Sequence, residues 1–184
     1  MVKYAAVLVF VLLFAIPVMA QDDYPRIQTS LGYANLGLVD YGSVNFDGSL
    51  TGQTSRHSGF ANETGFNFTR SLGVSNYMGV YGLGGNVTMI ADFIGGKAMY
   101  RTARAVPYAL AGIGFAYLSS GYYYGGSSFA TRWGGGVDVP FNDSMALKFE
   151  VSRMSFHLQT DVTGNATWHT GINFQTGVVF TIAQ

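Results

Sequence analysis

The chain has 184 residues, only 11% of them charged, and its 10 basic residues balance its 10 acidic ones. Ordinary soluble domains carry roughly 25% charged residues, so a water-facing surface made from this composition would dissolve poorly. The absence of a basic excess argues against nucleic acid as a partner, and the absence of cysteine excludes a disulfide-stapled secreted module.

Residues 1–20 have the pattern of a secretory signal peptide. Lys3 supplies a short basic region, residues 5–16 form an apolar run, and Val18-Met19-Ala20 ends on a small residue. A retained membrane anchor is the alternative, but the run is shorter than the ~20 residues that a spanning helix needs. We therefore expect cleavage after Ala20 and one mature domain at 21–184, with a net charge of about −1 once Lys3 is removed.

The first half of the mature chain contains four segments in which apolar and polar residues alternate, as in strands. The first sets Ile27, Leu31 and Tyr33 against small or polar residues, and the second sets Phe60, Phe66 and Phe68 against a face that includes Glu63. The alternation is poorer in the third, and in the fourth Gly95-Gly96 disturbs it, which predicts a β-bulge. These four predicted strands cover residues 25–38, 58–70, 74–82 and 87–101.

The second half contains four more regular strands, predicted at residues 106–118, 128–139, 145–157 and 168–182. In the last of them, one face carries Trp168, Ile172, Phe174, Val178, Phe180 and Ile182, and the other carries His169, Gly171, Asn173, Gln175, Gly177 and Thr181. A soluble sandwich would present Lys and Glu on its polar face. Glycine, amides and a hydroxyl suit a crowded, hydrogen-bonded interior instead, so the apolar face is predicted to be the outside.

The connections between these strands differ in length. Short turns are predicted at 71–73, 102–105 and 140–144, and longer loops at 39–57, 119–127 and 159–167, although the connection after the third strand, at 83–86, is also short. Short periplasmic turns and longer external loops are the layout of a bacterial membrane barrel with both termini in the periplasm. Closure is required, because an open sheet edge in lipid would leave backbone groups unpaired.

Several segments carry a resemblance to a known group. They are Tyr108-Ala-Leu-Ala-Gly-Ile-Gly-Phe115, Trp133-Gly-Gly-Gly-Val-Asp-Val-Pro140, Leu147-Lys-Phe-Glu-Val151 and the final alternating strand. The mature chain resembles the outer-membrane protein A-like barrels and the broad "outer membrane protein β-barrel domain" family. The resemblance implies an all-β, eight-stranded antiparallel up-and-down transmembrane β-barrel in the bacterial outer membrane, with outer-membrane lipids around it and the barrel assembly machinery as its partner during biogenesis. Such barrels commonly end on an aromatic residue that the machinery reads, whereas here Phe180 precedes Thr-Ile-Ala-Gln; Phe180 is expected to serve instead.

Charged residues on the polar faces are the strongest chemical feature. A narrow eight-stranded barrel is filled by side chains, so inward charges must pair or remain hydrated. A salt-bridge network is the favoured interpretation over a gated ion path, and Arg153, which alternation turns toward lipid, is expected near the external rim, where it can snorkel. The predicted network consists of Glu63, Arg132, Asp138, Lys148 and Glu150, with Asp92 and Lys97 as further candidates.

Other candidate sites are weaker. Tyr122, Tyr123 and Tyr124 lie in a predicted external loop and are candidates for contacts with sugars or host surfaces, although aromatic residues are also typical of membrane-interface girdles. The spacing of the three histidines, at 57, 157 and 169, matches no zinc signature. No catalytic residue, metal or cofactor is predicted.

The sequence therefore favours a small integral outer-membrane barrel with a structural or surface-interaction role and no open pore. A soluble periplasmic or secreted β-barrel that binds an apolar ligand is the first alternative. A lipid-modifying outer-membrane enzyme is the second, although His57-Ser58 lacks the His-x-Ser-Asn arrangement of a lipid A deacylase and no positioned base is evident.

Overall fold

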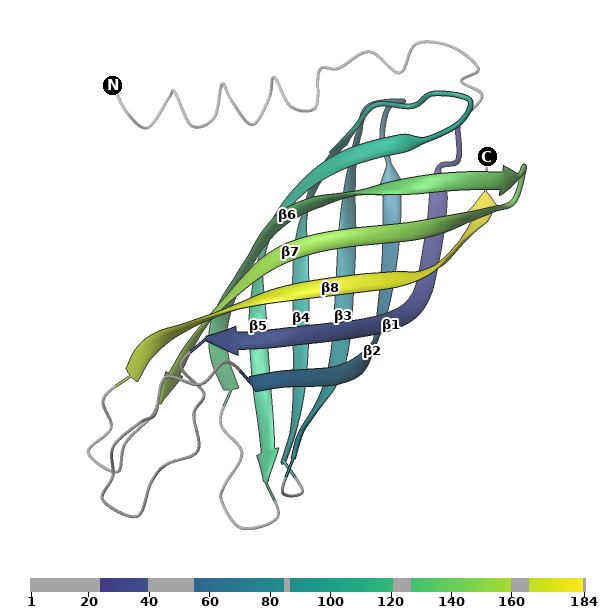
Figure 1. Cartoon of the computed structure of the whole chain (residues 1–184). Coiled ribbons are helices and arrows are strands. Elements are labelled where there is room, and N and C mark those ends of the chain that lie inside the picture. The colour runs from purple at the N-terminus through teal and green to yellow at the C-terminus, as the bar shows by residue number, and fades with distance from the viewer. Residues whose placement is uncertain (1–23, 40–54, 85–86, 121–126, 160–165, 184) are drawn as a thin grey trace, which may run out of the picture.

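The computed structural model describes residues 24–39, 55–84, 87–120, 127–159 and 166–183, which form eight antiparallel strands closed into one barrel (Figure 1). The described residues contain no helix long and apolar enough to cross a membrane. The strands are β1 (Ile27–Val39), β2 (Ser55–Asn67), β3 (Leu72–Gly84), β4 (Val87–Met99), β5 (Val106–Ser120), β6 (Ser127–Asn142), β7 (Met145–Gln159) and β8 (Ala166–Ala183). The predicted fold class and strand number are confirmed.

Each strand pairs with the next along the chain, and β8 closes on β1. The partners of Ile27, followed once around the barrel, return to β1 at Gly37, ten residues further along: Phe66, Val74, Gly96, Ala111, Trp133, Arg153 and Ile172. Such an offset requires strands that are strongly tilted to the barrel axis. In Figure 1 the strands of the front wall accordingly cross those of the back wall obliquely.

The two faces of each strand lie in different surroundings. Outward side chains are large and apolar, with Phe60 70% exposed and Phe115 63% exposed, while inward side chains such as Tyr77 and Lys148 are buried. Alternation places successive side chains on opposite faces of a strand. The prediction that the apolar face is the outside is therefore correct.

Strand ends differ from the sequence prediction where side chains make turns. β2 runs from Ser55 to Asn67 rather than from 58 to 70. It ends at Asn67 because Thr69 accepts hydrogen bonds from the backbone N–H groups of Ser71 and Leu72 and closes a tight turn. β3 is longer than predicted. Its poor alternation arises because the large inward residues there are tyrosines, Tyr77 and Tyr81.

The predicted bulge at Gly95-Gly96 is wrong. Both glycines pair without interruption on both sides, Gly95 with Gly112 of β5. A Cβ on Gly95 would collide with the backbone oxygen of Ala111 and lie 2.6 Å from the Gly112 Cα. The inward Gly32 of β1 meets Gly177 of β8 in the same way, at 2.7 Å. These glycines allow neighbouring strands to approach closely where the sheet curves sharply.

Candidate functional site

Six charged side chains meet inside the half of the barrel that lies nearest its short turns. We call this end of the barrel, with the connections at 68–71, 100–105 and 143–144, the turn end, and the opposite end, where β1 stops and β2 starts, the loop end. All six point inward, and at most 11% of any of their side chains is exposed. They are Glu63 of β2, Lys97 of β4, Arg132 and Asp138 of β6, and Lys148 and Glu150 of β7. Three positive charges thus face three negative ones.

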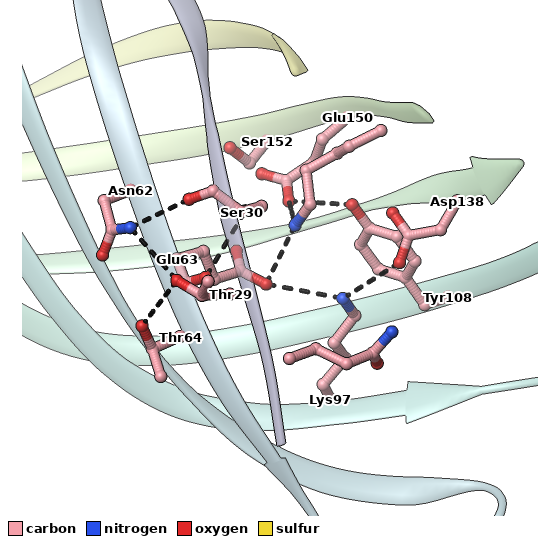
Figure 2. Close-up of polar contacts among 12 residues, drawn as sticks. Thr29, Ser30, Asn62, Glu63, Thr64, Lys97, Tyr108, Asp138, Glu150 and Ser152 are labelled. Atoms are coloured by element: carbon pink, nitrogen blue, oxygen red, sulfur yellow. Dashed lines mark hydrogen bonds and ion pairs between the residues drawn. The ribbon is translucent and has the colours of Figure 1, made fainter. Parts of the chain in front are cut away.

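Glu63 is the centre of this cluster, because all three cations reach it. Its carboxylate lies 3.0 Å from Lys148 Nζ, 3.4 Å from Lys97 Nζ and 3.2 Å from Arg132 Nη2. Figure 2 shows Glu63 and Lys97 approaching each other across the lumen from different strands. A buried carboxylate loses its hydration shell, and the contacts with three cationic donors compensate for much of the lost hydration free energy.

The other two carboxylates give each cation a second partner. Glu150 pairs with Arg132 and lies 3.8 Å from Lys148, and Tyr108 donates a hydrogen bond of 3.1 Å to it. Asp138 lies 3.6 Å from Lys97, toward the turn end. The cluster is therefore one connected network, in which the loss of any member leaves at least one other charge short of a partner.

Aromatic rings surround the cations. Lys97 Nζ lies 3.7 Å from the centre of the Tyr108 ring, and the guanidinium of Arg132 lies 3.8 Å from the centre of the Tyr77 ring. These are cation–π contacts in a site with little water. A chain of hydrogen bonds then continues toward the loop end, from Tyr77 to Tyr81 and from the Tyr81 hydroxyl to Asn173, at 2.9 Å.

The half of the lumen nearest the loop end is mostly apolar, with His169 and Asn173 as its buried polar members, and this layer was not predicted from the sequence. Phe93 and Phe156 pack there with ring centres 6.5 Å apart. Buried aliphatic and sulfur-containing side chains and alanines complete this apolar layer: Ala34, Leu36, Leu38, Ala61, Met89, Ala91, Ala116, Ala130 and Met154. The alternation of β7 contained the signal, since its inward face continues from Lys148, Glu150 and Ser152 into Met154 and Phe156.

Two spaces that border the charged network are small. One, of about 10 Å³, lies next to Arg132, and the other, of about 20 Å³, lies among Glu63, Lys97, Asp138 and Lys148. A cavity needs about 10–15 Å³ on this measure to hold one water molecule. Each space therefore has room for about one water.

The structure brings together all five residues of the predicted network and adds Lys97 to them. Asp92 is not a member, because it faces outward and accepts a hydrogen bond of 2.9 Å from Asn76. With unbroken pairing through Gly95-Gly96, positions 92 and 97 must lie on opposite faces. Arg153 faces outward as alternation requires, but it lies six residues before the end of β7 rather than at the rim.

The remaining candidates do not form a site. Tyr122, Tyr123 and Tyr124 lie outside the described residues. His157 faces outward and packs against Trp168, whereas His169 points into the lumen. Within the described part of the chain, no group of three or more His, Asp or Glu side chains could hold a metal ion.

A closed eight-stranded barrel with an apolar outside and a paired, charged inside is the architecture of a small outer-membrane protein. The family described as "Outer membrane protein beta-barrel domain" matches residues 6–180. The chain belongs to this family. A comparison with curated protein sequences finds no significant match.

Solved structures of similar fold are also outer-membrane barrels. Neisserial surface protein A superposes with a TM-score of 0.66 at 10% identity, over 85% of this chain and 97% of that one. The outer membrane protein OprG of Pseudomonas aeruginosa superposes with a TM-score of 0.54 at 12% identity, over 87% of this chain and 97% of OprG. Ail, the attachment invasion locus protein of Yersinia pestis, superposes with a TM-score of 0.50 at 16% identity, over 85% of this chain and 97% of Ail. At these identities the likeness shows the fold alone.

The outer-membrane barrel family explains the distribution of side chains over the two faces. In this barrel the outward belt of Phe, Ile, Leu and Val side chains faces lipid, and the lumen holds the paired charges. A soluble barrel that binds an apolar ligand would require the reverse arrangement. The soluble alternative from the sequence analysis therefore does not fit.

Proposed function

We propose that this protein is a closed, non-conducting barrel of the outer membrane, exported by a signal peptide cleaved after Ala20, that stabilises the membrane and presents external loops for contacts at the cell surface. The filled lumen is the observation that carries this proposal. A charged layer around Glu63 occupies one half, and a mostly apolar layer around Phe93 and Phe156 occupies the other. An ion would have to break the network and then cross the apolar layer, at a high cost in desolvation.

Conductance tests the closed lumen directly. Protein purified from outer membranes and reconstituted in planar lipid bilayers should produce no discrete current steps, whereas a general porin in the same bilayers does. Heat-dependent mobility in detergent gels establishes that the sample is folded. Steady single-channel steps from folded protein would overturn the proposal.

Replacement of the tyrosine run tests the surface role. Cells that express a variant with Tyr122, Tyr123 and Tyr124 replaced by serine should bind less to a glycan array or to protein-coated surfaces than cells with equal amounts of the unaltered barrel. Two proteins of similar fold are a neisserial surface protein and an attachment invasion locus protein, and such roles belong to those proteins. Equal binding by the two strains would contradict the surface role and leave the barrel with a structural role only.

We further propose that the protein is not an enzyme. Among the described residues, His157 lies on the outer face of β7 whereas His169 lies on the inner face of β8, so the wall of the barrel separates these two histidines. Nucleophilic catalysis needs a nucleophile, a base and an orienting group held together. Mass spectra of lipid A from cells with and without the protein should be identical, and a new acylation pattern would contradict this.

A further inference from the structure

The outer surface carries two charges in an unexpected place. Among the described strand residues, Asp92 of β4 and Arg153 of β7 face outward well away from the strand ends. Both lie within the belt of side chains that faces lipid. Charged side chains at this level of a barrel are unfavourable unless they have a partner.

Asp92 is surrounded by exposed apolar side chains. Ile90 and Ile94 flank it on the same face of β4, and Met78 and Phe115 lie opposite it on the two neighbouring strands. The only bond that the described residues give its carboxylate is the one from Asn76, whose side-chain amide also lies 3.5 Å from the Phe93 carbonyl. No cation of the described residues lies within ion-pair distance of Asp92.

Arg153 has the complementary surroundings. Its guanidinium lies 5.9 Å from the centre of the Trp133 ring, which is a weak contact, and the described residues offer it no carboxylate. One step nearer the loop end on the same outer face, the hydroxyls of Ser155 and Thr170 lie 3.2 Å apart. The cation is thus exposed among apolar side chains, with Trp133 and Ile172 opposite it on the two neighbouring strands and only these two hydroxyls nearby.

The two charges lie at matching depth. Asp92 is five residues from Val87, the loop end of β4, and Arg153 is six residues from Gln159, the loop end of β7. The strands lie three positions apart around the barrel, with β7 on the front wall and β4 on the back wall in Figure 1. Because every copy inserts in the same orientation, neighbouring barrels place Asp92 of one and Arg153 of the other at the same level.

We propose that copies of this protein associate side by side in the membrane through an ion pair between Asp92 of one barrel and Arg153 of the next. The contact joins two different walls, so it is heterologous and generates rows or rings rather than closed dimers. In lipid, the pair replaces two unpaired charges by one neutral contact. This association does not depend on whether the lumen conducts ions.

Cysteine cross-linking tests the contact in native membranes, because the chain has no cysteine of its own. Ile94→Cys and Val151→Cys lie on the outer face, each two residues nearer the turn end than Asp92 or Arg153. With both cysteines in one chain, a membrane-permeant bifunctional maleimide should produce a ladder of dimers and larger species. With either cysteine alone, the ladder should be absent.

Charge changes in the double-cysteine chain decide whether the ion pair is responsible. Asp92→Arg or Arg153→Asp should each lower cross-linking by about tenfold or more, as expected for a desolvated pair that loses one partner. The exchanged chain, Asp92→Arg with Arg153→Asp, should recover the ladder. Heat-dependent gel mobility establishes that each variant is folded.

Three results would overturn the proposal. The first is a complete absence of cross-linked species at native expression levels. The second is a ladder that neither charge reversal changes. The third is unchanged cross-linking in Arg153→Gln together with a loss of co-purifying phosphate-bearing lipid, which would assign Arg153 to a lipid headgroup instead.

Discussion

Replacing Glu63 with glutamine is the sharpest test of the lumen. Glutamine has nearly the same shape and keeps an oxygen acceptor, so packing is preserved while the charge is lost. Lys97, Arg132 and Lys148 would then share only two carboxylates, and one positive charge would remain uncompensated in the buried network.

The expected loss of stability follows from the partners that remain. Each cation keeps one carboxylate after the change, Lys97 with Asp138 and the other two with Glu150. The loss is therefore smaller than three broken ion pairs. One unpaired buried charge costs about 3–5 kcal/mol, and we expect Glu63→Gln to lower the free energy of unfolding by about this amount.

Urea unfolding in detergent or lipid vesicles measures this loss, and tryptophan fluorescence and gel mobility both report it. Asp143→Asn, in the exposed β6–β7 turn, is the matched control and should change stability by less than about 0.5 kcal/mol. Adding Lys148→Met to Glu63→Gln balances the charges again and should restore part of the lost stability. A network centred on Glu63 would be refuted if Glu63→Gln were as stable as the control, or if the double variant lost as much stability as the two single variants together.

Two further predictions concern the wall and the orientation of the barrel. Gly32→Ala should destabilise the barrel by about 1–3 kcal/mol, because the new methyl group meets the backbone of β8, whereas Gly96→Ala, which has nothing within 4 Å, should be nearly neutral; equal effects in urea unfolding would refute this. A membrane-impermeant maleimide should label cysteines at loop sites in intact cells and spare those at turn sites, and the opposite pattern would invert the topology. The loop sites are Ser49, Thr163 and Ser127, the last at the loop end of β6, and the turn sites are Ser71 and Asn142, the latter at the turn end of β6.

Alternation along the chain determined the architecture of this protein before any contact was known. A period of two is a local property of the sequence, and it separated the aromatic residues of β8 and its neighbours from the opposite face that carries Arg132, Asp138, Lys148 and Glu150. The shortage of charge and the glycine on the polar faces then indicated lipid around the barrel. For these features, the tertiary structure changed only the residues at which the strands begin and end.

Pairing between distant strands decided the rest. Glu63 of β2 reaches Lys97 of β4 and Lys148 of β7 only because the closed barrel brings non-adjacent walls within one lumen. The position of Asp92 depended on whether Gly95-Gly96 formed a bulge, and the unbroken pairing of β4 with both neighbours settled it. Partner choice and depth arise from strand register and closure, which are properties of the whole sheet, and no local pattern in the sequence specifies them.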